Sequence, residues 1–409
     1  MTSSPTDHSA LVERYDAISL SELQARNTTK WAAQPDSIGA WIAEMDFPLA
    51  EPVVAAVARL MEAGTVAYSP ASDFEELGRA YAQFCDRRYG WAPPAELVRA
   101  VPDVLAALQA VIQAYTSPGS PVIIPTPAYM PFLTLPGYFD REVLQVPLVQ
   151  EAGSGGAPGR WVYDLDALAA AFDAGAELLV LCNPHNPIGR VLERDEMLAI
   201  ADLVEAKGGL VFNDEIHAPL VYPGATHLPY ASLDERTAAH TITGTSASKA
   251  FNLPGLKCAQ ISFTNPAHAV TWERAGRWIG ASRPGIFANI AAYNEGEQWL
   301  AGVLAYLDRN RRALSGLVAE HLPGVGYREP EGTYLALLDL RGLGDVLEQR
   351  GGNPAYRDDP AAFLRERAGV VLTPGPACGE AAKGFVRLNF GTPLPVLEEA
   401  IRRMGAALG

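Results

Sequence analysis

Thr245-Ser-Ala-Ser-Lys-Ala-Phe-Asn-Leu-Pro-Gly-Leu-Lys257 is the stretch that decides how this sequence is interpreted. Lys249 lies between small hydroxyl residues, just after a run typical of a buried strand (His240 to Thr243). A second cation, Lys257, follows eight positions later. A lysine at the end of a buried strand is costly to desolvate, which favours a chemical role for it. The alternative explanation is an ordinary lysine in a Ser-rich surface loop.

A Schiff base is one such use for Lys249. A lysine amine is nucleophilic only when neutral, and burial or a nearby cation lowers its pKa toward that state. Ser246 could donate to a phosphate, and Lys257 could supply the counter-charge. The stretch therefore suggests pyridoxal phosphate (PLP), held both covalently and ionically, although on its own it does not exclude the surface loop.

The composition indicates a globular chain that does not bind nucleic acid. A chain of 409 residues is longer than a single hydrophobic core usually accommodates, which predicts two domains. Hydrophobic residues make up 48% and charged residues 19%, which argues against disorder. The formal net charge of −15 repels nucleic-acid phosphates, whereas a small anionic ligand depends on local cations because salt screens the far field beyond ~8 Å.

The sequence predicts a soluble, cytoplasmic protein without a metal site. No apolar run approaches the ~20 residues of a membrane span, and the polar N-terminus lacks a signal-peptide pattern. The seven histidines show no paired metal spacing. We expect reduced and mostly buried thiols from the four scattered cysteines, Cys85, Cys182, Cys258 and Cys378.

Short apolar runs alternate with helical patterns over most of the chain. Helices are predicted at 51–63, 74–89, 103–115, 165–172 and 194–207. Strands rich in Val, Ile and Leu are predicted at 122–124, 178–182, 210–213, 241–243 and 259–263. This alternation favours an α/β fold with a mostly parallel sheet, in which ligands bind beyond the carboxyl ends of the strands.

The outer segments form a second, smaller unit in this interpretation. We expect residues 1–50 to be an N-terminal arm that joins the small domain, with 1–30 irregular. Residues 51–294 would form the large domain and 295–409 a small α+β C-terminal domain. Its expected elements are a long helix after about 294, strands at 334–339, 370–373 and 385–389, and a final helix from about 395. Loops are predicted at 151–160 and 351–360.

The first polar motif, Pro102 to Leu108, is a strand-to-helix junction. The free amides of Val104 and Leu105 could hold a phosphate at the helix N-terminus. Asp103 would repel that phosphate unless its carboxylate turns back onto the helix amides. A plain capped helix is the alternative explanation.

Two further motifs follow strands of the predicted sheet. In Cys182-Asn-Pro-His-Asn-Pro-Ile-Gly-Arg190, Asn186 could donate to a phenolate oxygen or simply cap a turn. In Asn213-Asp-Glu-Ile-His217, an ionised Asp214 could keep a pyridinium nitrogen protonated, and His217 could reach the oxygen-bearing side of the ring. A satisfied core histidine and a carboxylate metal site remain alternatives for this motif.

Tyr129 and Arg387 complete the set of candidate residues. Tyr129, in Pro125-Thr-Pro-Ala-Tyr129, could stack on a planar ring or pack as an ordinary aromatic. Arg387 lies inside the apolar strand Phe385–Phe390, where a guanidinium needs an anion. A substrate carboxylate and a structural Asp or Glu partner are both compatible with that position.

Together these motifs resemble the aspartate-aminotransferase-type (fold type I) PLP enzymes. The resemblance is greatest to their cystathionine β-lyase (C–S lyase) branch of MalY- and PatB-like proteins. It extends from Trp41-Ile-Ala-Glu-Met-Asp-Phe47 to Arg387-Leu-Asn-Phe-Gly391 and includes Glu331–Leu340. It implies a mostly parallel seven-stranded sheet with helices on both faces, and Asp-Glu-Ile-His at 214–217 favours the lyase branch.

The resemblance also implies a role for each candidate residue. Lys249 would carry PLP and act as the catalytic base, Arg387 would bind the substrate α-carboxylate, and Ala43 would line the substrate pocket. Tyr68 would reach the phosphate in the neighbouring subunit of a homodimer. The remaining cofactor contacts would come from Val104, Leu105, Tyr129, Asn186, Asp214, His217, Ser246 and Lys257.

The reaction that this implies is α,β-elimination from a cysteine S-conjugate or cystathionine. The alternatives are transamination, decarboxylation-coupled oxidative deamination of a cysteine conjugate, and a non-catalytic regulatory protein on the same fold. Glu44 and Leu337 depart from the family's usual aspartate and aromatic, and both lie near the expected substrate side. An altered substrate is therefore compatible with the sequence.

Overall fold

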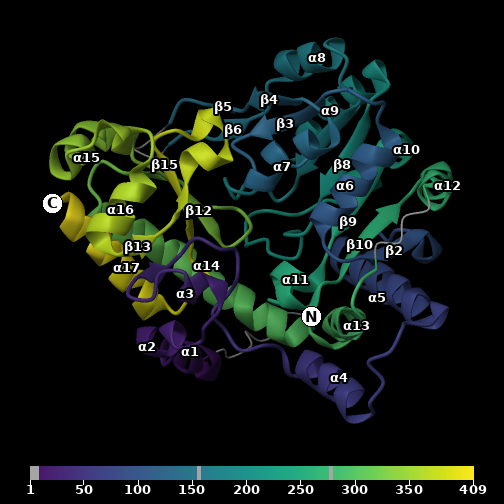
Figure 1. Cartoon of the computed structure of the whole chain (residues 1–409), viewed down its shortest axis with the longest axis horizontal. Helices are drawn as coiled ribbons and strands as arrows, with labels where there is room; N and C mark the ends of the chain where they lie inside the picture. The colour runs from purple at the N-terminus through teal and green to yellow at the C-terminus, as the bar shows by residue number, and fades with distance from the viewer. Residues whose placement is uncertain (1–8, 154–157, 276–279) are drawn as a thin grey trace.

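A seven-stranded sheet forms the centre of the computed structural model, which describes residues 9–153, 158–275 and 280–409 (Figure 1). All neighbouring strands are parallel except β10, which runs antiparallel to β2 and β9. The strand order is β2 (Val98–Val101), β10 (Ala259–Phe263), β9 (Thr241–Thr245), β8 (Leu210–Asp214), β7 (Leu178–Cys182), β3 (Val122–Thr126) and β4 (Val143–Pro147). The predicted fold class is confirmed, and β2 and β4 are strands that the sequence analysis missed.

Helices cover both faces of this sheet because its central strands are apolar on both sides. One core packs α6 (Val104–Tyr115) and α12 (Pro266–Arg274) on one face, and another packs α8 (Leu165–Asp173) and α9 (Arg194–Lys207) on the other. Asp103 caps α6, accepting a hydrogen bond from the Ala106 amide at 2.9 Å. This cap fixes the strand-to-helix junction where the phosphate was expected.

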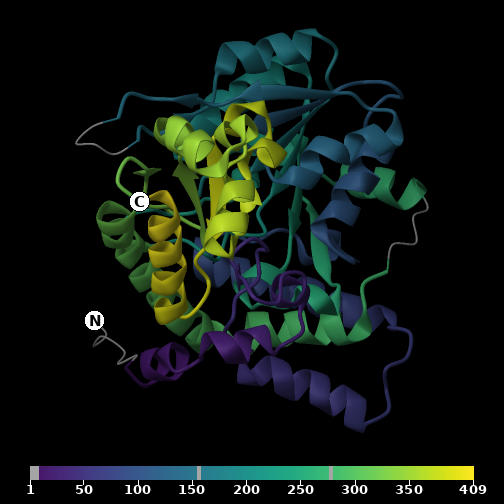
Figure 2. The ribbon, with the colours of Figure 1, turned by 60° about the vertical axis from the view of Figure 1, so that its left-hand side comes forward.

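A four-stranded antiparallel sheet lies toward the C-terminus. Its order is β11 (Gly326–Tyr327), β12 (Leu335–Asp339), β15 (Phe385–Asn389) and β14 (Thr373–Pro374). The predicted strand at 370–373 is in fact two, β13 (Val370–Val371) and β14, because they pair with different sheets. The long α14 (Glu297–His321) runs beside the final α17 (Leu394–Leu408), as Figure 2 shows.

The prediction of an irregular arm is wrong for the described part of residues 1–30. It contains α1 (Ser9–Asp16) and α2 (Leu20–Gln24), and α3 (Thr29–Ala32) follows at its end. These helices are short, and the burial of Tyr15, Leu23 and Trp31 in the main core stabilises them more than local propensity does. β1 (Ile38–Gly39) then pairs in parallel with β13, which fastens the arm to the C-terminal region.

The next helices pack against one another below the main sheet. They are α4 (Glu51–Glu62), α5 (Ala71–Tyr89) and α13 (Arg283–Glu295), of which α13 was not predicted. The remaining helices and strands are α7 (Met130–Thr134), α10 (Glu235–His240), α11 (Ala247–Ala250), α15 (Gly344–Gly351), α16 (Pro360–Ala368), β5 (Val149–Gln150) and β6 (Trp161–Val162).

The cysteines, the long helices and the predicted loops can also be located in the structure. All four cysteines are free and buried. In the described ranges, no helix has the length and apolarity needed to cross a membrane, and no three His, Cys, Asp or Glu side chains cluster as metal ligands. The predicted loop at 151–160 lies partly outside the described residues, and the loop at 351–360 contains a short 3-10 turn, Pro354–Arg357.

Candidate active site

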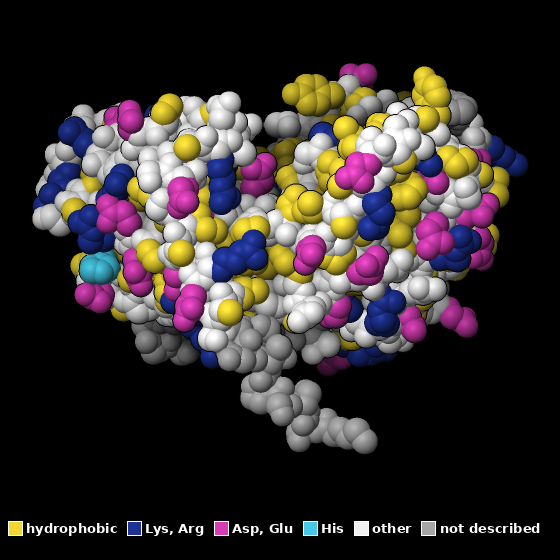
Figure 3. Space-filling model, turned by 90° about the horizontal axis from the view of Figure 1, so that it is seen from below, with side chains coloured by type: hydrophobic (Ala, Val, Ile, Leu, Met, Phe, Trp, Pro, Cys, Tyr) yellow, Lys and Arg dark blue, Asp and Glu magenta, His cyan; other side chains and the backbone are white. Residues whose placement is uncertain are grey.

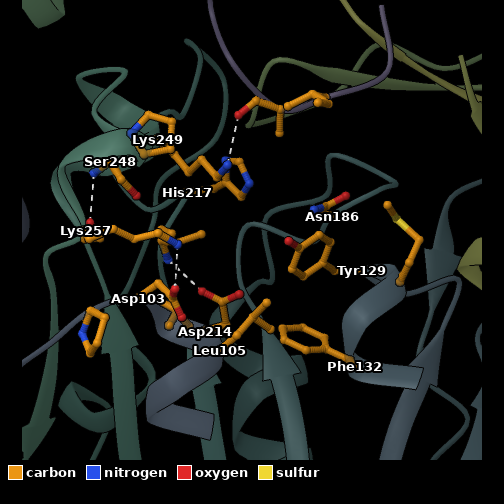
Figure 4. A pocket seen from close by; sticks show the side chains of 18 of the residues that line it. Asp103, Leu105, Tyr129, Phe132, Asn186, Asp214, His217, Ser248, Lys249 and Lys257 are labelled. Carbon is orange, nitrogen blue, oxygen red and sulfur yellow. Dashed lines mark hydrogen bonds and ion pairs between the residues drawn. The ribbon is translucent and has the colours of Figure 1, made fainter. Parts of the chain in front are cut away.

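The candidate residues meet in one cavity of about 300 Å³ at the carboxyl ends of the central strands (Figure 4). This is the edge at which a parallel sheet presents its loops to a ligand. Of the twelve predicted site residues, all but Tyr68 line it. These are Ala43, Val104, Leu105, Tyr129, Asn186, Asp214, His217, Ser246, Lys249, Lys257 and Arg387.

Lys249 projects into the cavity from α11, the short helix that follows β9. Its Nζ donates a hydrogen bond to the Ala43 carbonyl oxygen at 2.9 Å. Burial, and after it the nearby Arg387 charge, lower the pKa of Lys249 to about 8. A substantial fraction of the amine is therefore neutral near pH 8, as a nucleophile or a base requires.

Asp214 lies at the end of β8 and is 5% exposed. Its Oδ1 accepts a hydrogen bond from the Ile216 amide at 3.0 Å. Burial raises the pKa of Asp214 to about 7, although that amide and the Lys249 charge oppose the rise. A carboxylate so costly to ionise is poised to pair with a cationic group that enters the cavity.

The Asp103 carboxylate does turn back onto its helix, so the expected repulsion of a phosphate is reduced. While Oδ1 accepts from Ala106, Oδ2 pairs with Lys257 Nζ at 3.0 Å. The amides of Val104 and Leu105 are in the first turn, which has no intrahelical acceptor for them. This corner therefore offers two amides and one exposed ammonium to an anion.

Ser246 contributes to this corner in a different way from that expected. Its hydroxyl donates to the Cys258 carbonyl at 2.7 Å and accepts from the Ser248 amide at 2.9 Å, which caps α11. To donate to a phosphate, the hydroxyl would have to rotate away from Cys258. Ser248, which was not singled out, also lines the cavity.

Arg387 is 2% exposed, and among the described residues no Asp or Glu pairs with it. Its Nη1 donates to Asn186 Oδ1 at 3.1 Å, and its Nη2 donates to the Trp41 carbonyl at 2.7 Å and to Thr373 Oγ1 at 2.9 Å. Its Nε finds no hydrogen-bond partner among the residues that the structure describes. The guanidinium is thus oriented by neutral acceptors, and a structural carboxylate does not explain its burial.

His217 and Tyr129 lie on different sides of the cavity (Figure 4). Burial lowers the pKa of His217 to about 3, with Lys249 and Arg387 adding to the effect, so the imidazole is neutral at physiological pH. Within the described ranges, its Nδ1 has no hydrogen-bond partner. Tyr129 packs edge-on against Phe132, and burial raises the pKa of its hydroxyl.

Tyr68 lies apart from this cavity. It is fully exposed, at 102%, in the segment between α4 and α5. Its own chain therefore gives it no role in the site. Three residues in or next to the second sheet, Tyr334, Thr373 and Asn389, hold the backbone and Arg387 at the cavity wall. They carry no local signal for a site in the sequence.

The residues present fit PLP. The cavity combines a lysine amine, a buried carboxylate and an anion corner of amides and an ammonium. Two buried polar atoms without partners, His217 Nδ1 and Arg387 Nε, lie on residues that also line it. A ligand that carries an aldehyde, a pyridine nitrogen and a phosphate uses each of these groups.

Comparison with known proteins agrees with this geometry. The model of the family "Aminotransferase class I and II" matches residues 42–404. The chain is 37% identical to cystathionine beta-lyase of Corynebacterium glutamicum over 95% of this chain and 99% of that protein. The structure of cystalysin from Treponema denticola, which contains pyridoxal 5'-phosphate, superposes with a TM-score of 0.84 at 26% identity, covering 93% and 95% of the two chains.

A second solved structure is equally similar. It is the PLP-bound C-S lyase from Staphylococcus hominis, with a TM-score of 0.84 at 25% identity, covering 96% of this chain and 98% of that one. Each of the two solved structures therefore covers more than nine-tenths of this chain.

Proposed function

Because the chain belongs to the aminotransferase class I and II family, we propose that it is a PLP-dependent C–S β-lyase. Its substrate would be a cysteine S-conjugate or cystathionine, and its products a thiol, pyruvate and ammonia. The observation that carries the proposal is that Lys249, Asp214 and Arg387 line one cavity, and none of the three has a structural ion-pair partner among the described residues. The similarity to cystathionine beta-lyase and C-S lyase supports this choice of reaction.

Each wall of the cavity would hold one part of the cofactor. Asp214 would face the pyridine nitrogen, and Tyr129 the ring plane. Asn186 can donate its Nδ2 to the phenolic oxygen because its Oδ1 is engaged by Arg387, and His217 would lie beside the same oxygen. The phosphate would take the corner formed by Val104, Leu105, Ser246 and Lys257. Bound PLP supplies an electron sink for the pair released at the substrate Cα.

Lys249 would act as the base that removes the substrate Cα proton. The neutral Nζ takes the proton, and the C–H electron pair becomes the Cα–Cβ double bond while the C–S pair leaves with sulfur. The ammonium can then return its proton to the departing thiolate, so the lysine ends neutral. Water afterwards releases ammonia and pyruvate from the enamine product.

A turnover count separates this proposal from transamination. We expect many turnovers of S-methyl-cysteine when no 2-oxo acid is added. A transaminase would stop after one turnover per site, because nothing would take up the amine. Carbon dioxide released in step with the substrate would instead indicate decarboxylation-coupled deamination and would contradict the proposal.

Arg387 would bind the substrate α-carboxylate as a planar fork. We expect Arg387→Lys to lower kcat/KM by ~100-fold, mainly through KM, because a lysine cannot keep the Asn186, Trp41 and Thr373 contacts and also pair bidentately. Steady-state kinetics checks this. An S-conjugate of cysteamine, which lacks the carboxylate, serves as the control, and its binding should be similar in both proteins. An unchanged KM for the amino acid would rule out this role.

We further propose a homodimer in which Tyr68 completes the partner's phosphate corner. Figure 3 looks onto the face that carries α4, where apolar side chains lie among charged ones. On α4 and the segments beside it the exposed apolar side chains are Leu49, Val54, Met61, Val66, Tyr68 and Phe74. Such a concentration of exposed apolar side chains favours a protein interface.

Subunit mixing tests this arrangement. We expect Tyr68→Ala and Lys249→Ala to be nearly inactive separately, and activity to reappear after the two are unfolded and refolded together. One site of the mixed dimer would then carry both wild-type residues. A molecular mass of 43.7 kDa for the native protein in sedimentation, or no recovery on mixing, would contradict the shared site.

A further inference from the structure

The segment 41–46 is held by side chains from three parts of the chain: the N-terminal arm, the region of α11, and the second sheet with the residue before it. It crosses the cavity wall between the two sheets, and Trp41, Ile42 and Ala43 line the cavity. Each of its six backbone carbonyls accepts a side-chain hydrogen bond. The Trp41 carbonyl accepts from Arg387 and Thr373, that of Ile42 from Asn389, and that of Ala43 from Lys249 and Tyr334. The Glu44 carbonyl accepts from Lys30 and Asn389, that of Met45 from Asn252, and that of Asp46 from Arg26.

The Ala43 carbonyl is the point at which this segment meets Lys249. It accepts from Lys249 Nζ at 2.9 Å and from the Tyr334 hydroxyl at 2.9 Å. A carbonyl oxygen has two lone pairs, so these two donors satisfy it. Tyr334 is fully buried, and its hydroxyl therefore fixes the direction in which the other lone pair points.

Tyr334 is itself held in place by an uncommon backbone. The preceding Thr333 has a left-handed φ of 67°, which a β-branched residue adopts only when its surroundings require it. Its amide donates to the Leu220 carbonyl at 2.8 Å, and its carbonyl accepts from the Tyr222 hydroxyl. The Phe390 amide donates to the Tyr334 carbonyl at 3.0 Å. These contacts leave the Tyr334 hydroxyl little freedom.

We propose that Tyr334 is a positioning residue for Lys249 and acts through the Ala43 carbonyl. The inference rests on the proposed function, in which Lys249 must be free of the cofactor when it removes a proton. One N–H of the free amine would stay on the Ala43 oxygen while the nitrogen lone pair points into the cavity. After proton transfer the same carbonyl would accept from the ammonium, so the base keeps one position in both protonation states.

Tyr334→Phe removes the hydroxyl and keeps the ring, and it is the direct test. We expect kcat to fall about tenfold, as loss of one buried hydrogen bond predicts, with KM unchanged. The primary isotope effect of Cα-deuterated substrate should rise because proton transfer becomes slower than the other steps. The bound PLP and its absorption spectrum should stay as in the wild type. Cα exchange of L-alanine in D2O, followed by NMR, should slow by the same factor.

Tyr230→Phe is the matched control. It also removes a buried tyrosine hydroxyl, but that hydroxyl bonds to His240 Nε2 at 3.1 Å and not to Ala43 or to the residues that hold Tyr334. We expect it to lower the unfolding temperature while leaving the isotope effect and the alanine exchange as in the wild type. Equal isotope effects and exchange rates in Tyr334→Phe and the wild type would overturn the inference, as would the same rise in Tyr230→Phe.

The alanine exchange and a second variant, Asn389→Ser, test the position of Lys249 in two further ways. Alanine has no β leaving group, so its Cα exchange tests the position of Lys249 even if the protein does not catalyse elimination. The proposed elimination is tested separately, by whether a cysteine S-conjugate yields thiol and pyruvate. If Tyr334→Phe does not fold, Asn389→Ser loosens the same segment at Ile42 and Glu44 without touching Tyr334. It should raise the isotope effect in the same direction, and no rise would contradict the inference.

Discussion

Lys249→Ala is expected to lower turnover of a cysteine S-conjugate by at least ~10⁴-fold, because in the proposed function one amine is both cofactor anchor and base. Borohydride should fix PLP to the wild type and not to the variant, as peptide mass analysis can show. The fold should survive, since Lys249 makes a single hydrogen bond to Ala43 and is partly desolvated. A small primary amine added to the variant should restore part of the activity.

Lys257→Ala provides the comparison for this loss. The Lys257 side chain is 61% exposed and its ammonium pairs with Asp103, so we expect weaker PLP binding but continued borohydride attachment at Lys249. If Lys249→Ala retained covalent PLP, or if Lys257→Ala lost it at saturating cofactor, the assignment of the anchor would be wrong.

Asp214→Asn is expected to lower kcat by ~10²–10³-fold, since the amide cannot hold a pyridine nitrogen protonated. The substitution is nearly isosteric, and the Asn oxygen can keep the Ile216 amide bond. Steady-state kinetics at saturating PLP and substrate separates this effect from weaker binding. A variant within a few-fold of the wild type would exclude Asp214 as the partner of the ring nitrogen.

The same substitution should stabilise the cofactor-free protein. Burial raises the pKa of Asp214 from 3.8 to about 7, so the folded chain holds a proton that the unfolded chain has released between those values. Stability therefore falls as pH rises through this window, and above it the deficit reaches up to roughly 4 kcal/mol. Thermal unfolding at pH above 7 should show a higher unfolding temperature for Asp214→Asn, with no difference below the unfolded pKa.

Glu215→Gln is the control for this stability gain. Glu215 is also buried, but its Oε1 accepts from Asn213 Nδ2 at 2.6 Å and from the Tyr230 amide at 3.0 Å. We expect this variant to lose stability, because its carboxylate is satisfied by the fold. A gain in both variants would mean that Asp214 carries no special cost.

The central strands and their helices could be predicted because they are locally encoded. β7 is apolar and fully buried, and α9 begins and ends at the predicted residues. The missed strands, β2 and β4, lie at the two edges of the sheet, where Arg99 and Gln145 interrupt the apolar pattern. Edge strands depend on pairing more than on composition, so the sequence carries little trace of them.

The sequence predicts those site residues whose chemical role depends on their own side chain and its place next to a strand. Lys249, Asp214 and Arg387 are ionisable residues shortly after a strand, at the end of one and inside one, which is a local signal. The contact between Tyr334 and Ala43 joins residues 291 positions apart and depends on how the second sheet meets the first. The Asp103 and Ser246 side chains also find partners that only the folded chain reveals.

Product balance with S-methyl-cysteine tests the account most directly. The purified protein, saturated with PLP and given no 2-oxo acid, should release methanethiol, pyruvate and ammonia in equal amounts over many turnovers. Arg387, Asp214 and Lys249 would then share one α,β-elimination site. Consumption of the amino acid without thiol, or an amine that appears only on an added 2-oxo acid, would contradict the assignment as a C–S β-lyase.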